Sequence, residues 1–314
     1  MFLQNVGIAA RQVLILYLIV AVGFLADKCK VFTEPTARRC TDLVFYIVTP
    51  AKILESFFNL AYSPETAKRL FIALGCGFAL HAVAALISAV AFRYKCPAER
   101  ACIFKYACTY GNCGYMGLPL TEAVAGEEGV IYCSAVIIAF QVFTFTHGVY
   151  LMNMGKPEAV KFDPKKLVLN PGVLAVAVGL PIYLLSPALP QVVTAPVSYI
   201  AALNTPLAML IFGTFIANTD FKAIFREPRM LEVGLIKLFL LPAIMLAGMR
   251  LCGLSGTLLT TIIITASAPS ANNTVMFAAK FDRDAGLASQ VVAIISIFSI
   301  LTMPLMIAAA QSVG

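Results

Sequence analysis

Residues 110–120 read Tyr-Gly-Asn-Cys-Gly-Tyr-Met-Gly-Leu-Pro-Leu and lie within a long apolar stretch. Glycine permits unusual backbone angles and proline removes a hydrogen-bond donor, so this run predicts a broken helix. A second run of this kind, Ser-Ala-Pro-Ser-Ala-Asn-Asn-Thr, occupies residues 267–274 of a later apolar stretch. Irregular backbone at membrane depth is tolerated only inside protein or beside a water-filled cavity. Paired breaks of this type are the best sequence pointer to a binding site in a membrane protein.

The rest of the chain is equally apolar. Of its 314 residues, 60% are hydrophobic and only 12% are charged, whereas soluble domains carry about 25% charged residues. Runs of about 20 apolar residues span a bilayer as helices. We expect ten such helices, at residues 6–26, 36–59, 66–92, 98–123, 128–152, 167–186, 194–217, 229–250, 254–280 and 285–311. The predicted fold class is an all-α polytopic membrane protein, with the breaks in its fourth and ninth helices.

Basic residues between the apolar runs predict the orientation in the membrane. One set of alternate loops carries sixteen Lys and Arg residues, and the opposite set carries four, namely Arg11, Lys68, Arg69 and Arg250. Lys and Arg are enriched in cytoplasmic loops. We therefore expect a multi-pass protein of the cell membrane with both termini outside. The net charge of +7 is explained by this orientation and does not indicate a nucleic-acid partner.

Short motifs recur in the two halves of the chain. Val20-Ala21-Val22-Gly23 recurs as Val176-Ala177-Val178-Gly179, and Thr49-Pro50 recurs as Thr205-Pro206, both at an offset of 156 residues. Pro119 matches Pro269 at an offset of 150. Because five helices are an odd number, successive copies enter from opposite sides of the membrane, which gives an inverted repeat. The predicted parts are residues 1–152, a cytoplasmic loop at 153–166 and residues 167–314.

The two predicted breaks are suited to a small anion. Helix segments that resume after a break present unpaired N–H groups and a positive dipole end. No Asp, Glu, Lys or Arg lies in residues 111–119 or 267–274, and a metal cation would prefer carboxylate ligands. We therefore predict an organic-anion substrate, with no metal and no cofactor. The candidate substrate-binding residues are Asn112, Gly114, Pro119, Gln141, Pro269, Ser270, Asn272 and Asn273. The alternative interpretation is a pair of kinked helices whose small residues serve close packing.

Other polar residues inside the apolar runs are candidates for a functional or a structural role. His81, His147 and Lys237 are candidates for proton coupling, because ionisable groups within a membrane are costly and often functional; a neutral buried histidine is the alternative for the first two. Gln141 either lines a cavity or makes a bond between helices. Lys52 and Glu55, three residues apart, predict a local ion pair.

The run 110–120, followed by Gly126-Glu127-Glu128-Gly129, resembles the helix-4 signature of the auxin efflux carrier family. Asn170-Pro171 and Pro269 with its Asn and Ser neighbours also match that family. The resemblance implies that the broken helices 4 and 9 cross, with the substrate at the crossing. It further implies a scaffold of helices 1, 2, 6 and 7, a moving unit of the other six, and a homodimer.

The family includes plant auxin exporters and bacterial carriers assigned to malate or malonate. The short loop at 153–166 favours the bacterial, organic-acid type, because long-loop plant members carry a large insert there. Two rival readings stay open: a sodium-coupled carrier of the bile-acid-symporter type, and a receptor or subunit without flux of its own. The chain has no GxSxG, HExxH or P-loop motif, so we expect no enzyme activity.

Overall fold

The computed structural model describes residues 2–93, 97–155, 165, 168–219, 222 and 227–313. Helices account for 84% of the structure and no strand occurs within the described part, which confirms the predicted all-α class. The predicted cytoplasmic loop at 153–166 lies mostly outside the described residues.

The first half of the chain contains two long uninterrupted helices, α1 and α4, and several helices that continue through π-helical turns, labelled η. The elements are α1 (Phe2–Lys28), α2 (Glu34–Leu43), η1 (Val44–Val48), α3 (Thr49–Asn59), α4 (Pro64–Ala91), α5 (Ala98–Thr109), η2 (Cys113–Gly117), α6 (Leu118–Phe143), η3 (Thr144–Gly148) and α7 (Val149–Asn153). Within α6, Gly126 has a φ of 64° and separates two helical pieces. Only glycine adopts this angle readily, so Gly126 makes the turn between the predicted fourth and fifth helices.

The described part of the second half is also built from helices and one π-helical turn. Its elements are α9 (Pro171–Leu185), α10 (Gln191–Ala201), α11 (Asn204–Ala217), α13 (Arg229–Leu235), η4 (Ile236–Leu240), α14 (Leu241–Leu251), α15 (Gly256–Ser267), α16 (Asn273–Lys280) and α17 (Ala285–Val313). Asn170 caps α9, because its side-chain oxygen accepts from the N–H of Gly172 at 3.0 Å.

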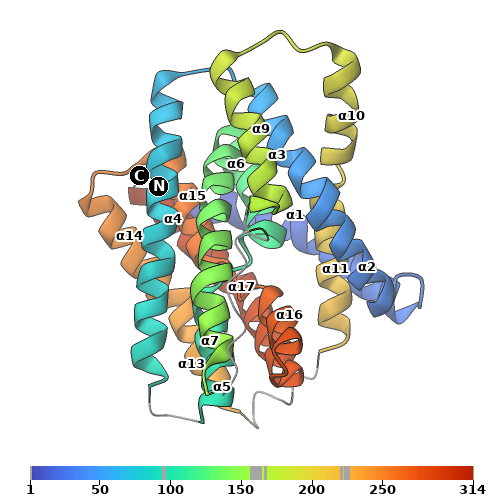
Figure 1. Ribbon diagram of the computed structural model, residues 1–314, viewed down its shortest axis with the longest axis vertical. Coiled ribbons are helices and arrows are strands. Elements are labelled where there is room, and N and C mark those ends of the chain that lie inside the picture. Colours follow the sequence, from blue (N-terminus) through green and yellow to red (C-terminus); the bar gives the residue numbers. More distant parts are fainter. Residues whose placement is uncertain are drawn as a thin grey trace.

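Five helical stretches of the described residues are long and apolar enough to cross a membrane: Pro64–Ala91, Cys113–Asn153, Gln191–Ala217, Arg229–Leu251 and Ala285–Val313. Two shorter helices, α9 and α15, are also apolar. The chain is therefore built as a polytopic, membrane-embedded protein. Figure 1 shows the long helix α4 running nearly along the longest axis of the molecule.

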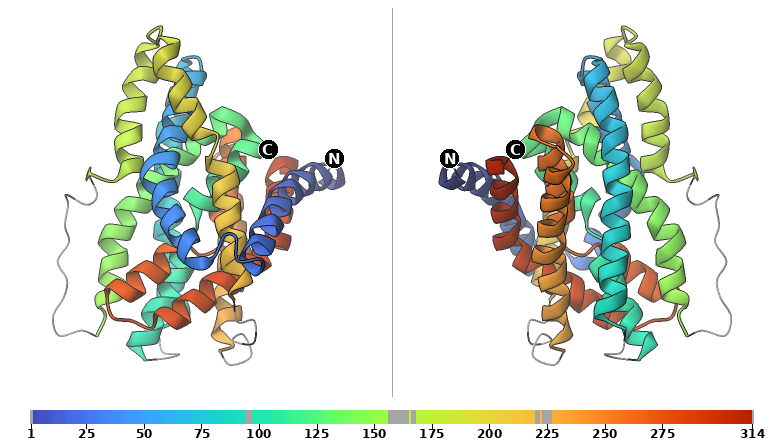
Figure 2. Two further views of the ribbon diagram at one scale, coloured as in Figure 1. Left: turned by 90° about the vertical axis from the view of Figure 1, so that its right-hand side faces the viewer. Right: turned by 90° about the vertical axis from the view of Figure 1, so that its left-hand side faces the viewer.

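Close helix packing depends on two glycines at one contact. α1 packs along α11 and α17, as Figure 2 shows. A Cβ on Gly23 of α1 would lie 2.3 Å from the carbonyl oxygen of Leu210, and one on Gly213 of α11 would lie 2.0 Å from that of Val20. Small residues let membrane helices approach backbone to backbone. At the centre of the fold, Ala101–Thr109 of α5 and Leu258–Ser267 of α15 are buried without interruption.

Candidate functional site

The two predicted helix breaks meet at the centre of the molecule. α5 ends at Thr109 and α15 ends at Ser267, and the extended segments that follow lie antiparallel, with Gly111 bridged to Ser270. The N–H of Asn112 donates to the carbonyl of Pro269 at 2.6 Å, and the N–H of Ala271 donates to the carbonyl of Tyr110 at 2.9 Å. We call these paired segments, residues 110–112 and 268–272, the crossing.

The two prolines do not play equal parts there. Pro269 lies in the break itself, where its carbonyl accepts a hydrogen bond from the other segment. Pro119 is the second residue of α6 and follows a helical turn that already began at Cys113. The break predicted within the run 110–120 is therefore present, but it does not lie at Pro119. A proline is tolerated near a helix start, and the break lies earlier, at Tyr110–Asn112.

A cavity of about 40 Å³ lies beside the crossing. Among the predicted site residues, Asn112, Gly114, Gln141, Asn272 and Asn273 line it. Pro119, Pro269 and Ser270 are not among its lining residues, and the hydroxyl of Ser270 donates instead to the carbonyl of Ala107 at 2.8 Å. Asn170 and the aromatic side chains of Phe45 and Phe140 are also part of the wall. The sequence identified Asn170 only as a motif residue.

The polar side chains of this cavity present donors. The side-chain oxygen of Asn112 accepts from the N–H of Tyr115 at 3.2 Å, and that of Asn170 caps α9. Since these bonds fix each amide orientation, the NH₂ groups remain for another acceptor. Among the described residues, the amides of Gln141 and Asn273 have no hydrogen-bond partner. Of the residues that the structure describes, those lining the cavity include no charged side chain.

Backbone N–H groups add to these donors. α16 begins at Asn273, and within the described structure the N–H groups of Asn272 and Asn273 have no backbone acceptor. The first N–H groups of a helix lack intrahelical partners and carry its positive dipole end. An uncharged cavity with several unpaired donors is suited to an anion, such as a carboxylate.

Residues 8–307 match the family described as "Membrane transport protein". The chain belongs to this family. The resemblance to the auxin efflux carriers is thereby confirmed.

Two relatives match this membrane transport protein along nearly their whole length. An "uncharacterized transporter" of Methanocaldococcus jannaschii is 22% identical over 301 residues, covering 93% of this chain and 96% of its own. A protein of Rhizobium meliloti named "Putative malonate transporter" is 24% identical over 299 residues, covering 91% of this chain and 90% of its own.

Two larger cavities of this transport protein adjoin the crossing cavity. The first, of about 580 Å³, shares Gln141, Asn170 and Asn273 with the crossing cavity and extends to Lys165 and Lys280. We call it the vestibule. It lies on the side of the molecule where the sixteen basic residues are expected, because Lys165 and Lys280 belong to that set.

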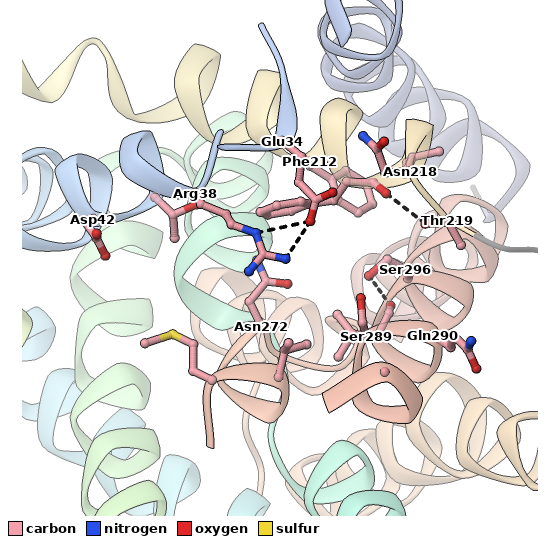
Figure 3. Close-up of a pocket in the computed structure, with 18 residues that line it drawn as sticks. Glu34, Arg38, Asp42, Phe212, Asn218, Thr219, Asn272, Ser289, Gln290 and Ser296 are labelled. Atoms are coloured by element: carbon pink, nitrogen blue, oxygen red, sulfur yellow. Dashed lines mark hydrogen bonds and ion pairs between the residues drawn. The ribbon is translucent and has the colours of Figure 1, made fainter. Parts of the chain in front are cut away.

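The second, of about 480 Å³, lies between α2, α11, α16 and α17 and reaches the crossing at Asn272 (Figure 3). Arg38, in its wall, is paired with Glu34 at 2.6 Å. Both large cavities therefore lead to the N-terminal turn of α16.

The three candidates for proton coupling lie at different distances from the crossing. His81 is buried, and its Nδ1 lies 2.7 Å from the carbonyl oxygen of Gly77. Nδ1 of His147 lies 3.0 Å from the hydroxyl of Tyr110, whose backbone forms part of the crossing. Lys237 lies against the crossing itself, with Nζ 3.3 Å from the carbonyl oxygen of Ala266.

Lys52 forms more than the predicted local pair with Glu55. Its ammonium contacts Glu55 at 3.0 Å, Glu122 at 2.8 Å and Glu127 at 3.2 Å, and its side chain is only 4% exposed. We call these four residues the Lys52 cluster. It joins α3 to α6 through Glu122 and Glu127. Asn204 also makes a contact between helices, because its side-chain oxygen accepts from the hydroxyl of Thr49 at 3.0 Å.

Gly111→Ala is expected to destabilise the protein by about 1–3 kcal/mol, the usual cost of overpacking. The added Cβ would lie 2.8 Å from Nζ of Lys237 and 3.3 Å from the carbonyl oxygen of Ala268. The matched control is Gly234→Ala in α13, where a Cβ meets nothing within 4 Å. Thermal unfolding of both purified variants is the measurement, and equal stability of the two would contradict the tight contact at the crossing.

Proposed function

We propose that this protein is a secondary transporter of small organic anions, such as malonate or malate, that works by alternating access. The observation that carries the proposal is the pairing of the two helix breaks beside a donor-rich cavity without charged side chains. A carboxylate requires donors, and the amides of Gln141 and Asn273 and the N-terminal turn of α16 supply them. The name of the Rhizobium meliloti relative, at 24% identity, supports the same substrate class.

The size of the cavities favours entry through the vestibule. A space of about 40 Å³ holds little more than water, so a dicarboxylate bound at the crossing also occupies part of the adjoining 580 Å³. Substrate therefore reaches the crossing from the side of Lys165 and Lys280, whose positive charges attract an anion.

We also propose ten membrane spans arranged as two inverted five-helix repeats, residues 1–152 and 167–314, joined by the loop 153–166. The paired breaks occupy corresponding places in the two halves. The repeated Thr-Pro motifs support the same arrangement, because Thr49 of the first bonds Asn204, the residue before the second. The homodimer built through helices 1, 2, 6 and 7 is part of the proposal and follows from the family resemblance.

The proposed alternating access places the Lys52 cluster opposite the vestibule. α2, η1 and α3 form one continuous path from Glu34 to Asn59. Asp42 lines the vestibule and Thr49 lines the crossing cavity. Lys52 lies about 15 Å beyond Asp42 along this path, at 1.5 Å per residue. The cluster then closes the outer side while the vestibule is open to the cytoplasm.

Proton coupling is proposed for the substrate itself or for a side chain outside the crossing cavity, with His81, His147 and Lys237 as the candidates. Of these, His147 has the shortest hydrogen-bond path to the crossing backbone, through Tyr110. Replacing each candidate singly with Gln and recording malonate uptake against pH tests this coupling. An unchanged pH profile in all three variants leaves only uniport or a substrate-borne proton.

Uptake of radiolabelled malonate into proteoliposomes tests the function directly. We expect saturable uptake that persists when sodium is replaced by choline at fixed pH, because no carboxylate lines the crossing cavity to hold a metal cation. Uptake that is lost entirely without sodium would favour the bile-acid type of carrier. Binding without uptake would favour a receptor or subunit. A thermal-shift screen against mono- and dicarboxylates identifies the substrate, since a ligand stabilises the state that binds it.

Two exposed cysteines test the proposed orientation in the cell membrane. Cys29 follows α1 on the proposed cytoplasmic side, and Cys252 follows α14 on the opposite side. On intact cells, a membrane-impermeant maleimide is expected to label Cys252 and not Cys29, because both termini are proposed to lie outside. The signal should vanish in Cys252→Ser and persist in Cys29→Ser. The reverse pattern would invert the topology.

A further inference from the structure

Lys237 is a buried lysine that contacts the crossing from outside its cavity. Its side chain is 1% exposed, and it lies in the π-helical turn η4, a feature frequent at functional sites. A Cβ on Gly111 would lie 2.8 Å from Nζ, so the ammonium lies directly against the crossing backbone. Lys237 is not among the residues that line the crossing cavity. The ammonium and the cavity therefore lie on different faces of the same segment.

The ammonium lies where two helices end. The last carbonyl groups of a helix lack intrahelical partners and carry its partial negative charge. In α15, the hydroxyl of Ser267 donates to the carbonyl of Ile264 at 3.2 Å, and Lys237 donates to that of Ala266 at 3.3 Å. In α5, the carbonyl of Ala107 accepts from Ser270 at 2.8 Å. Side chains thus bond carbonyl groups at both helix ends, and Lys237 is the charged donor among these three.

No carboxylate neutralises this ammonium within the described residues, because none of their ion pairs includes Lys237. A buried charge without a partner is strongly unfavourable. The carboxyl ends of α5 and α15 supply the compensating negative potential. Broken-helix transporters in general use such carboxyl ends and unwound carbonyls to coordinate a sodium ion or proton.

We propose that the Lys237 ammonium is a tethered cation that occupies the place of a bound monovalent cation at the crossing. It is a positioning residue: it holds the carboxyl ends of α5 and α15 together, and thereby the amino-terminal turns that face the substrate. Only the backbone around Gly111 separates the ammonium from the crossing cavity, so its positive charge also favours an anion in that cavity. Only the uptake measurement for this inference rests on the proposed function. The effect of Lys237 on the stability of the fold is measurable without a substrate.

Chemical rescue tests the tethered cation. Lys237→Ala removes three methylene groups and the ammonium, and n-propylammonium has the same atoms. The apparent melting temperature of detergent-purified Lys237→Ala is expected to fall below that of the wild type and to recover in propylammonium chloride, but not in choline chloride or n-propanol. In proteoliposomes, malonate uptake is expected to fall about tenfold, the effect of a lost buried charge at a helix end, and to rise again with propylammonium.

Lys105→Ala is the matched control, since Lys105 is also a buried lysine, in α5. Propylammonium should stabilise neither this variant nor the wild type. If folded Lys237→Ala cannot be purified in ordinary buffer, it is purified in propylammonium chloride and in choline chloride. A higher yield of folded protein in propylammonium chloride then reports the same rescue. Lys237→Met preserves most of the volume and should stay impaired in both salts.

Three results would overturn the proposal: wild-type stability and uptake in Lys237→Met, equal effects of propylammonium and choline on Lys237→Ala, or equal stabilisation of Lys105→Ala by propylammonium. Failure of the wild type to take up malonate would instead count against the proposed substrate. The melting-temperature comparison then still decides whether Lys237 is a tethered cation.

Discussion

Malonate affinity is expected to fall about tenfold or more in Asn273→Ala, because a hydrogen bond to a charged group contributes about 1.5–3 kcal/mol. Asn273 begins α16, lines both the crossing cavity and the vestibule, and its side chain has no partner among the described residues. Its removal therefore takes a donor from the anion without breaking a bond within the fold. Thermal-shift titration with malonate gives the affinity, and proteoliposome uptake gives the transport rate.

Asn204→Ala is the matched control for this change. Asn204 is likewise an asparagine at the start of a helix in an apolar stretch, but it is 1% exposed, and its side-chain oxygen accepts from the hydroxyl of Thr49. We expect this variant to lose stability and to retain the malonate affinity of the folded protein, because Asn204 lines none of the three cavities at the crossing. Equal losses of affinity in the two variants would mean that the substrate lies elsewhere. Asn112→Ala is less clean, since Asn112 also caps the turn that begins at Cys113.

The helix breaks could be predicted from the sequence because their cause is local. Glycines and prolines limit what the backbone can do within a few residues, so the runs 110–120 and 267–274 indicated irregular backbone without any knowledge of the fold. The same local reasoning did not give the position of the break within the first run. Pro119 has the strongest single-residue signal, yet the helix starts before it, and the break coincides with the pairing of Gly111 with Ser270, 159 residues away in the sequence.

The charges around the crossing could not be predicted in this way. Lys237 lies in a different helix from either break, and only the packing of η4 against Gly111 brings its ammonium to the crossing. The partners of Lys52 were missed for the same reason. Glu55 is three residues away and was found, whereas Glu122 and Glu127 are joined to Lys52 by the packing of α6 on α3. Sequence spacing identifies neighbours within one helix, and pairs between helices require the fold.

The residues that line the crossing cavity could be predicted from the sequence only in part. Asn112, Gln141, Asn272 and Asn273 were predicted because polar side chains within apolar runs are costly unless they serve a purpose, and all four line the crossing cavity. Asn170 lines the same cavity, but its position before Pro171 is fully explained by helix capping. Its free NH₂ group becomes evident only when the cap is seen to use the side-chain oxygen.

Lys52→Met is expected to destabilise the protein by up to about 3 kcal/mol, the low end of the cost of removing one partner from a buried ion pair, because Glu122 and Glu127 are 35% and 33% exposed. Lys52 is the only cation in a cluster with Glu55, Glu122 and Glu127, as far as the described residues show. Without it the three carboxylates repel one another, and α6 is no longer held to α3. Under the proposed function, the outer side then opens. Hydrogen exchange of residues 118–128 should rise, while that of α4 stays near the wild-type level.

Lys68→Met is the matched control, because Lys68 is an exposed lysine of the next helix and its loss should change stability by less than about 0.5 kcal/mol. Adding Glu55→Gln and Glu122→Gln to Lys52→Met should recover much of the lost stability, since two of the repelling charges are then gone. In this combined variant the neutral side chains still pack, but no ion pair joins α3 to α6. If stability recovers and malonate uptake does not, the ion pairs of the Lys52 cluster are required to close the outer side during transport. A Lys52→Met protein as stable as Lys68→Met, with unchanged exchange at 118–128, would show that the cluster does not hold the outer side closed.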